Sequence, residues 1–300
     1  LKAEIIADPK RFVDVDPDLP QTLLDLRDAG KKLFLATNSE WHYTRAMMEF
    51  TFAPFLAGAP WQSLFDLVVV QAKKPGFFEA SAPFFEVIDD AGNVRPMKGA
   101  LRAGTVFRGG NAELVQRHFG VEGGEILYVG DHVYADVHVS SQIRRWRTAL
   151  VLRELEDEVV QEQAFAADQT QLEQCMREKE VLEHEQATLR LALQRHEHGA
   201  PMPPDVPTAV PAIQERLRAL RPLIEALDQR IVPLARTSGQ IGNQRWGPWM
   251  RAGNDKSRLA RQIERYADVY TSRVSNFVHL TPFGYLRAAR GTLPHDHAGG

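Results

Sequence analysis

The first half of the chain alternates short apolar runs with more polar stretches of helical spacing. The apolar runs have the length of buried strands and lie at residues 33–37, 65–70, 125–130 and 146–152. Helices are expected over 43–50 and 111–119, the second with Asn111 as its N-cap, and residues 85–94 are expected to form a small β-hairpin. Strands that alternate with helices predict an α/β fold, in which a parallel sheet carries helices on both faces.

After Leu152 the pattern becomes one of long helices. Residues 153–198 contain neither Gly nor Pro, and a Pro-rich break at 199–204 precedes a second stripe of apolar residues. The two stripes consist of Leu182, Leu189 and Leu193, and then of Ile213, Leu217, Leu220, Ile224, Leu227, Ile231 and Leu234. They predict two long antiparallel helices, with bends at Pro222 and Pro233, whose usual role is packing or dimerisation. We therefore expect a homo-oligomer.

The chain is expected to divide into three parts. Residues 1–152 would form the α/β core, residues 153–240 the helical arm, and residues 241–300 a C-terminal helix and tail that pack back on the core. The last part mixes aromatic residues with arginines, and its helix is expected over 255–277.

Charge and composition narrow the classes of partner. Lys and Arg number 36 and Asp and Glu 39, so the net charge of −3 favours neither a nucleic-acid coat nor an anionic membrane surface. No apolar run approaches the roughly 18 residues of a membrane-spanning helix. The lone cysteine, Cys175, excludes an internal disulfide and fits a reducing compartment, so a cytoplasmic location is expected. The chain begins at Leu1 rather than Met, and we expect a processed product or a fragment.

Three short stretches that follow predicted strands could carry chemistry, because open α/β sheets bind ligands at the carboxyl ends of their strands. Thr37-Asn38-Ser39 could hold a phosphate or simply cap a helix. Lys73-Lys74-Pro75 could neutralise a phosphate oxygen or end a strand in solvent. The stretch from Gly130 to Asp136 offers two carboxylates, Asp131 and Asp136, as hard-cation ligands, or else a helix cap and a surface residue.

The order of the three stretches resembles motifs two, three and four of the haloacid dehalogenase superfamily. The local sequence is similar to that of the cytosolic purine 5′-nucleotidase, type II family. The segments that carry this resemblance are 34–39, 61–66, 74–78, 109–110, 126–136, 146–148, 261–268 and 282–286. They cover most of the chain apart from the middle of the helical arm. The resemblance implies a Rossmann-like haloacid dehalogenase core and hydrolysis of purine nucleoside 5′-monophosphates such as IMP and GMP.

The resemblance also implies a role for each matched residue. Thr37 would donate a hydrogen bond to the transferring phosphate, with Asn38 beside it. Lys74 would balance the charge of the phosphate, and Asp131 would bind Mg²⁺. Asp136 would support the metal shell and orient Lys74. In the family an aspartate attacks phosphorus to form an aspartyl-phosphate, which water then hydrolyses.

The first family motif, an Asp-x-Asp that precedes the cap domain, has no match in this chain. Asp14-Val15-Asp16 follows no buried strand and leaves no room for a cap before Thr37, so we assign no nucleophile. The sequence is accordingly expected to be the C-terminal part of a longer enzyme that lacks the first strand and the cap. The alternative is a catalytically silent nucleotide-binding or scaffold protein that oligomerises through the helical arm.

A second family site, which binds purine nucleotide effectors, is matched in part. Its residues would be Tyr134, Gln262, Arg265 and Tyr266, an arrangement that offers an aromatic ring to a base and a guanidinium to a phosphate. Gln142 stands where the family has a basic residue.

Overall fold

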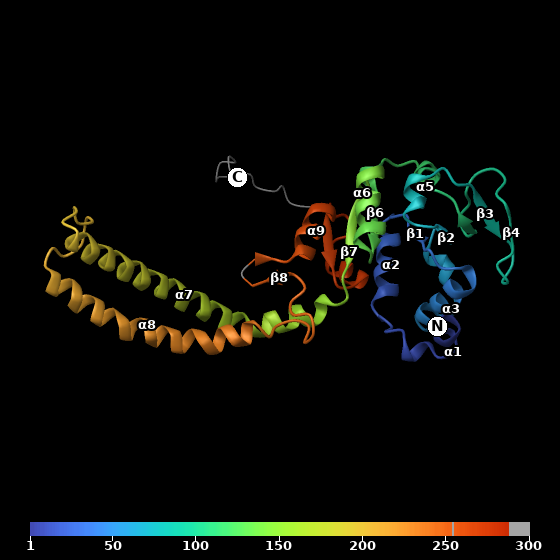
Figure 1. The fold of residues 1–300 in the computed structure, drawn as a ribbon. Helices are drawn as coiled ribbons and strands as arrows, with labels where there is room; N and C mark the ends of the chain where they lie inside the picture. The colour runs from blue at the N-terminus through green and yellow to red at the C-terminus, as the bar shows by residue number, and fades with distance from the viewer. Residues whose placement is uncertain (254, 288–300) are drawn as a thin grey trace. The chain divides into compact units, whose positions relative to one another are not determined.

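The computed structural model describes residues 1–253 and 255–287. The chain forms two compact units: one consists of Leu1–Arg153 and Arg258–Gly300, and the other of Glu154–Ser257. The first unit is an α/β fold, and the second is built on two long helices (Figure 1).

A five-stranded mixed sheet forms the first part of the α/β unit. Its strands, in spatial order, are β1 (Phe34–Ala36), β2 (Leu67–Val70), β5 (Val106–Gly109), β3 (Phe84–Val87) and β4 (Val94–Pro96). β1, β2 and β5 are parallel, and β3 runs antiparallel to both β5 and β4. The β3–β4 pair confirms the predicted hairpin. β5 was not predicted, because its four residues include two polar or glycine positions, Arg108 and Gly109.

A three-stranded parallel sheet forms the second part of this unit. Its order is β10 (Val269–Thr271), β7 (Arg147–Val151) and β6 (Leu127–Gly130). The helix expected over 255–277 is wrong: α9 spans Arg258–Tyr266 only. It ends there because the residues that follow are drawn into the sheet, where the Asp268 carboxylate accepts the Thr148 N–H at 3.0 Å before β10 pairs with β7.

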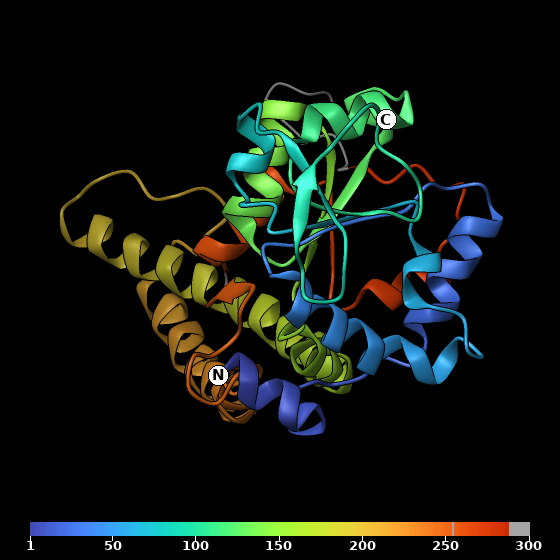
Figure 2. The same cartoon turned by 90° about the vertical axis from the view of Figure 1, so that its right-hand side faces the viewer.

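Helices cover both faces of the five-stranded sheet (Figure 2). They comprise α2 (Leu19–Asp28), α3 (Trp41–Phe52), α5 (Ala112–Phe119) and α6 (Val139–Arg144), with the short α4 (Gly76–Glu79). The short α1 (Lys2–Ala7) packs against α3. The run of apolar residues in β2 is continuous because the strand is buried on both faces. Val68 and Val70 pack with residues of α2 and α3, whereas Leu67 and Val69 pack with residues of α5 and α6. A strand buried on both faces has no polar side to show in its sequence.

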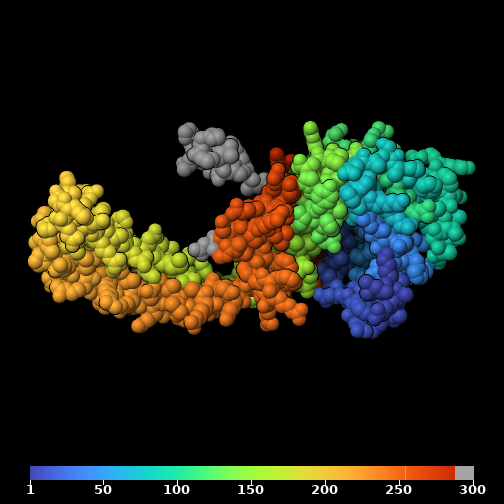
Figure 3. Space-filling model, in the orientation of Figure 1, coloured from blue at the N-terminus to red at the C-terminus, as the bar shows by residue number. Residues whose placement is uncertain are grey.

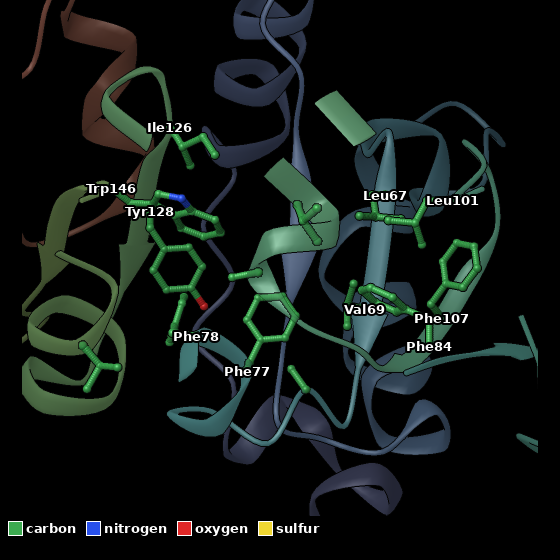
Figure 4. Packing of buried hydrophobic residues seen from close by; sticks show 14 residues of the cluster. Leu67, Val69, Phe77, Phe78, Phe84, Leu101, Phe107, Ile126, Tyr128 and Trp146 are labelled. Atoms are coloured by element: carbon green, nitrogen blue, oxygen red, sulfur yellow. The ribbon is translucent and has the colours of Figure 1, made fainter. Parts of the chain in front are cut away.

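One hydrophobic core joins the two sheets of this unit. Figure 4 shows Phe77 and Phe78 of α4 between Tyr128 and Trp146 on one side and Val69 and Phe107 on the other. The ring of Phe78 lies 5.1 Å from that of Tyr128 and 5.7 Å from that of Trp146, both edge-on, which is a favourable geometry for aromatic pairs. Phe34 of β1 adds further ring contacts with Tyr128 and Trp146.

The second unit is dominated by α7 (Leu155–Glu197) and α8 (Val210–Ser238). The two helices lie side by side in both ribbon views, and their side chains fill the space between them in Figure 3. The predicted stripes meet: Leu189 and Ala192 of α7 form one buried cluster with Ile213 and Leu220 of α8. α8 continues through Pro222 and Pro233.

Charged pairs across the two helices define their direction. Glu185 pairs with Arg216, Lys179 with Asp228, and Glu178 with Arg230. The residue numbers rise on one helix as they fall on the other, so α7 and α8 are antiparallel, as predicted.

The segment after α8 belongs to the same unit as the two long helices. The buried Glu158 carboxylate of α7 accepts the backbone N–H groups of Trp249 and Met250, and the Gln161 side chain accepts the Gly242 N–H at 2.8 Å. Residues 241–257 therefore group with the helical pair, whereas we expected them to group with the C-terminal part. Residues 288–300 of the expected C-terminal tail lie outside the described residues.

Candidate active site

The carboxyl ends of β1, β2 and β6 bring most of the predicted site residues to one edge of the α/β unit. Thr37 and Asn38 follow β1, Lys74 lies four residues after β2, and Asp131 directly follows β6. Asp136 lies in η5 (Val133–His138), a short helix with wide, π-helical turns. Its direct contact with Lys74 joins the β2 loop to the β6 loop.

The centre of this site is an ion pair between Lys74 and Asp136. The Lys74 Nζ lies 2.8 Å from the Asp136 Oδ1, and the two side chains are only 14% and 4% exposed. Neither charge has much water around it, so each depends on the other for its solvation. The Lys74 ammonium also lies over the Tyr128 ring, 5.6 Å from its centre. Burial, with the nearby Asp136 carboxylate, raises the pKa of the Tyr128 phenol well above its usual value, so Tyr128 stays neutral.

Asn38 fixes the backbone that carries Lys74. Its Oδ1 accepts the Lys74 N–H at 2.6 Å, and its Nδ2 donates to the Lys74 carbonyl at 3.1 Å. The amide of Asn38 is thus engaged with both backbone groups of Lys74. In this structure Asn38 acts as a positioning residue.

Backbone hydrogen bonds join the loops after β1 and β2. The Gln71 N–H donates to the Ser39 carbonyl, and the Ala72 N–H to the Thr37 carbonyl, both at 2.9 Å. Gln71 and Lys73 have positive φ angles of 46° and 60°, a conformation that side chains other than Gly rarely adopt. The hydrogen bonds to the neighbouring loop hold this strained backbone, and that backbone presents Lys74.

Thr37 keeps its hydroxyl available for donation. Its Oγ1 accepts the Ser39 N–H at 3.2 Å, which leaves the hydroxyl hydrogen to donate elsewhere. The helix-cap alternative does not apply to Asn38 or Ser39, since the N-cap of α3 is Glu40.

Gly130 is required by the close approach of Asp136. A Cβ at residue 130 would lie 2.6 Å from the Asp136 Cγ and 2.8 Å from its Oδ2. The backbone N–H of His132 donates to the same Oδ2 at 3.3 Å. The Gly-Asp-x4-Asp spacing therefore has a steric cause, because the second carboxylate folds back onto the backbone of the glycine.

We expect Gly130→Ala to destabilise the protein by about 1–3 kcal/mol, because the new methyl group must push Asp136 away from Lys74. Gly124→Ala is the matched control, since a Cβ there meets nothing within 4 Å. Urea unfolding of both variants measures the difference. Equal stability of the two would show that Asp136 moves without cost.

Asp131 is exposed and offers a carboxylate at the end of β6. Hard oxygen ligands of this kind suit Mg²⁺, which usually takes one or two carboxylates and completes its shell with water and substrate phosphate. Within residues 1–253 and 255–287, no group of three or more His, Cys, Asp or Glu side chains could enclose a metal ion. The described residues thus fit one part of a magnesium site and do not complete one.

Asp14 and Asp16 each have partners outside the group of predicted site residues. The Asp14 carboxylate accepts from Arg153 at 3.0 Å, and this hydrogen bond lowers the pKa of Asp14. The Asp16 carboxylate accepts from the Ser275 hydroxyl at 2.6 Å.

Three of the four predicted effector residues are brought together by a residue that the sequence did not indicate. The His138 ring stacks on the Tyr134 ring at 5.4 Å and meets the Tyr266 ring edge-on at 4.4 Å. The Arg265 guanidinium lies 5.3 Å from the centre of the Tyr266 ring. The Nδ1 atom of His138 is buried and has no hydrogen-bond partner among the described residues. The contact between the two rings is indicated in the sequence by the four-residue spacing of Tyr134 and His138, which puts both rings on one side of η5.

Gln262 is exposed on α9, three and four residues before Arg265 and Tyr266. This spacing puts it on their side of the helix.

The parallel strands β1, β2 and β6 of the α/β unit thus present a hydroxyl, a lysine and two carboxylates near their carboxyl ends, a set suited to binding a phosphate group and a hard cation. Comparison with known proteins agrees. A model of the 5′-nucleotidase family matches residues 1–298, and the chain belongs to this family. This confirms the resemblance to the 5′-nucleotidase family.

The chain is also similar to a 5′-nucleotidase domain-containing protein of Dictyostelium discoideum. The two are 26% identical over 311 aligned residues, which cover 99% of this chain. The chain spans 46% of the length of that protein. No helix among the described residues is both long enough and apolar enough to cross a membrane.

Proposed function

We propose that the chain is the C-terminal part of a cytoplasmic, Mg²⁺-dependent 5′-nucleotidase that hydrolyses purine nucleoside 5′-monophosphates such as IMP and GMP. The observation that carries the proposal is the buried Lys74–Asp136 pair, beside Thr37 and Asp131, in a chain of the 5′-nucleotidase family. The preference for purines rests on the similarity of the motifs to the type II enzymes.

The arrangement of strands supports a haloacid dehalogenase-like core whose first strand comes from another part of the protein. Among the described residues, β1 is hydrogen-bonded to β2 alone and β6 to β7 alone. A parallel strand between β1 and β6 would join the two sheets. Its carboxyl end would then lie next to the loops that carry Thr37 and Asp131. The matched relative is about twice as long as this chain, which leaves room for such a strand and a cap domain.

In the proposed site each residue has one task. Thr37 donates its hydroxyl hydrogen to a phosphate oxygen, and the Lys74 ammonium offsets the negative charge that gathers around phosphorus. Asp136 keeps Lys74 aimed at the carboxyl edge, while Asn38 holds the Lys74 backbone. Asp131 supplies one oxygen ligand to Mg²⁺, which when bound would lower the charge repulsion between phosphate and nucleophile.

The covalent step requires a carboxylate from outside this chain. A carboxylate oxygen forms a bond to phosphorus as the bond from phosphorus to the 5′ oxygen breaks, and the 5′ oxygen takes up a proton from solvent as the nucleoside leaves. Water then attacks the aspartyl-phosphate, which releases inorganic phosphate and restores the carboxylate. Lys74 and Thr37 would hold the same phosphate in both steps.

The ring cluster around His138 supports a nucleotide effector site on the same unit. A purine base could stack on the exposed face of Tyr134, which is 56% accessible, while Arg265 on the neighbouring α9 would bind a phosphate. Gln142, in place of a basic residue, would weaken the hold on that phosphate.

The second candidate is a catalytically silent nucleotide-binding or scaffold protein that forms homo-oligomers through α7 and α8. Exposed apolar side chains on both helices favour a contact between copies: Val160, Val181 and Leu223 are 62%, 66% and 47% accessible. Both candidates include a homo-oligomer. They differ in whether a longer form of the protein, which supplies the nucleophile, turns over IMP.

The 300-residue chain alone is expected to hydrolyse little or no IMP in the presence of Mg²⁺, because Lys74 and Asp131 cannot form the covalent intermediate. A phosphate-release assay measures this, and the longer protein with an upstream Asp-x-Asp should be active. Robust turnover by the 300 residues, abolished by Asp14→Asn or Asp16→Asn, would contradict the proposed division. An inactive longer protein would favour the scaffold.

A further inference from the structure

A pocket of about 360 Å³ lies at the opposite edge of the three-stranded sheet from the candidate active site. Arg145 and Arg147 border it at the start of β7, and Gly124 borders it just before β6. Tyr285 and Arg287, from the C-terminal segment, also line the pocket. The strands between the two edges have four and five residues, so the pocket is roughly 15 Å from Asp131. Its residues all belong to one compact unit.

The pocket carries an excess of positive charge. Three guanidinium groups line it, against the single lining carboxylate of Asp268. That carboxylate already accepts the backbone N–H of Thr148 at the junction of β7 and β10. Within the described part of the chain, Arg145 and Arg287 have neither an ion pair nor a side-chain hydrogen bond. Like charges held together without partners raise the local potential and attract an anion.

Arg147 is held in place for such a role. Its guanidinium donates to the Leu286 carbonyl at 3.2 Å and lies over the Tyr285 ring, 3.2 Å from the ring centre. The stack uses one face of the ring, and Tyr285 remains 70% accessible. A guanidinium that is already stacked and hydrogen-bonded loses little more conformational entropy when it binds a ligand, and this low cost favours binding.

Arg145 has a left-handed backbone conformation, which glycine adopts more readily than other residues. It caps α6 with φ 55° and ψ 29°, in the left-handed region, and its N–H donates to the Ser141 carbonyl at 3.1 Å. The turn at the end of α6 packs tightly against the segment around Gly123 of the same chain. A Cβ at Gly123 would lie 2.3 Å from the Arg144 carbonyl oxygen. The turn therefore fixes the place of the Arg145 backbone on the rim of the basic pocket.

We propose that this pocket binds a small anion with two linked phosphate groups. Two linked phosphate groups carry about three negative charges at neutral pH, which is close to the charge of the three guanidinium groups, and each guanidinium can bind a pair of phosphate oxygens. The volume lies within the usual range for small-molecule sites. The inference is independent of the proposed function, because none of these residues lies in the candidate active site.

Calorimetric titration with inorganic diphosphate at constant ionic strength tests the proposal. The wild-type chain should bind one equivalent saturably. Arg145→Gln/Arg287→Gln should weaken binding at least about tenfold, because two charged hydrogen-bonding groups are lost. Arg190→Gln is the matched control, an exposed arginine on α7 in the other unit, and should change binding less than about twofold. Lys74→Gln should leave binding in place, which separates this pocket from the candidate active site.

Two results would overturn the proposal: no saturable binding at millimolar diphosphate, or equal binding by the wild type and the double variant. Thermal melts of each variant establish that it is folded, and both substituted side chains are on exposed residues. A parallel titration with adenosine diphosphate identifies the source of the phosphates. Tighter binding of the nucleotide would indicate that Tyr285 receives a base, and equal binding would indicate inorganic diphosphate.

Discussion

Leu220→Asp is expected to unfold or separate the α7–α8 pair. Leu220 is fully buried in the cluster with Leu189, Ala192 and Ile213. Loss of a buried leucine costs about 2–5 kcal/mol, and a carboxylate without a partner in the same place adds to that cost. We therefore expect a loss of more than about 4 kcal/mol in the free energy of unfolding. Urea unfolding followed by circular dichroism measures the loss of helix.

The neighbouring Arg221→Asp provides the control for that variant. The Arg221 side chain is 80% accessible and pairs with Glu225 one turn further on. Replacing it with Asp turns this pair into a repulsion worth about 0.5 kcal/mol. Equal and small effects of the two substitutions would mean that the apolar stripe of α8 does not hold the pair together.

Asp131→Asn is expected to reduce IMP hydrolysis by about 100-fold or more in a longer protein that contains the nucleophile. The reason is that the amide removes the charge that this edge offers to Mg²⁺, without a change of shape. Activity measured over a range of Mg²⁺ concentrations should show a shifted metal dependence.

His132→Ala is the control beside it. The His132 Nδ1 accepts the Ala135 N–H at 3.0 Å and so caps η5. The substitution should cost about 1 kcal/mol of stability, with a much smaller effect on rate. Normal rates and normal Mg²⁺ dependence after Asp131→Asn would contradict the metal assignment.

The sequence predicted local elements well wherever local pattern decides the structure. The buried strand expected at 65–70 and found at Leu67–Val70 is one example. The helix capped by Asn111 is another, and the Asn111 Oδ1 indeed accepts the Leu114 N–H. β10 and the early end of α9 were not predictable in this way. Residues 269–271 become a strand because β7 offers an edge, and that edge is formed by a segment more than 100 positions earlier in the chain.

The same distinction applies to the candidate site. The positions of Thr37, Lys74 and Asp131 after strands could be predicted, since each follows an apolar run. The role of Asn38 as a clamp on the Lys74 backbone could not, because it depends on the distance between two loops. The role of His138 could not be predicted for a similar reason: its ring contacts that of Tyr266, which lies on a helix far along the chain.

The two strand edges at β1 and β6 also bear on how these 300 residues behave when produced alone. Each edge carries backbone N–H and C=O groups without a ladder partner among the described residues, and Phe34 and Tyr128 keep the surroundings apolar. Such edges are templates for pairing with strands of other molecules. In a longer form of the protein, as proposed above, a strand between β1 and β6 would protect both edges from aggregation, and the solubility of the 300 residues would depend on whether such a strand is present.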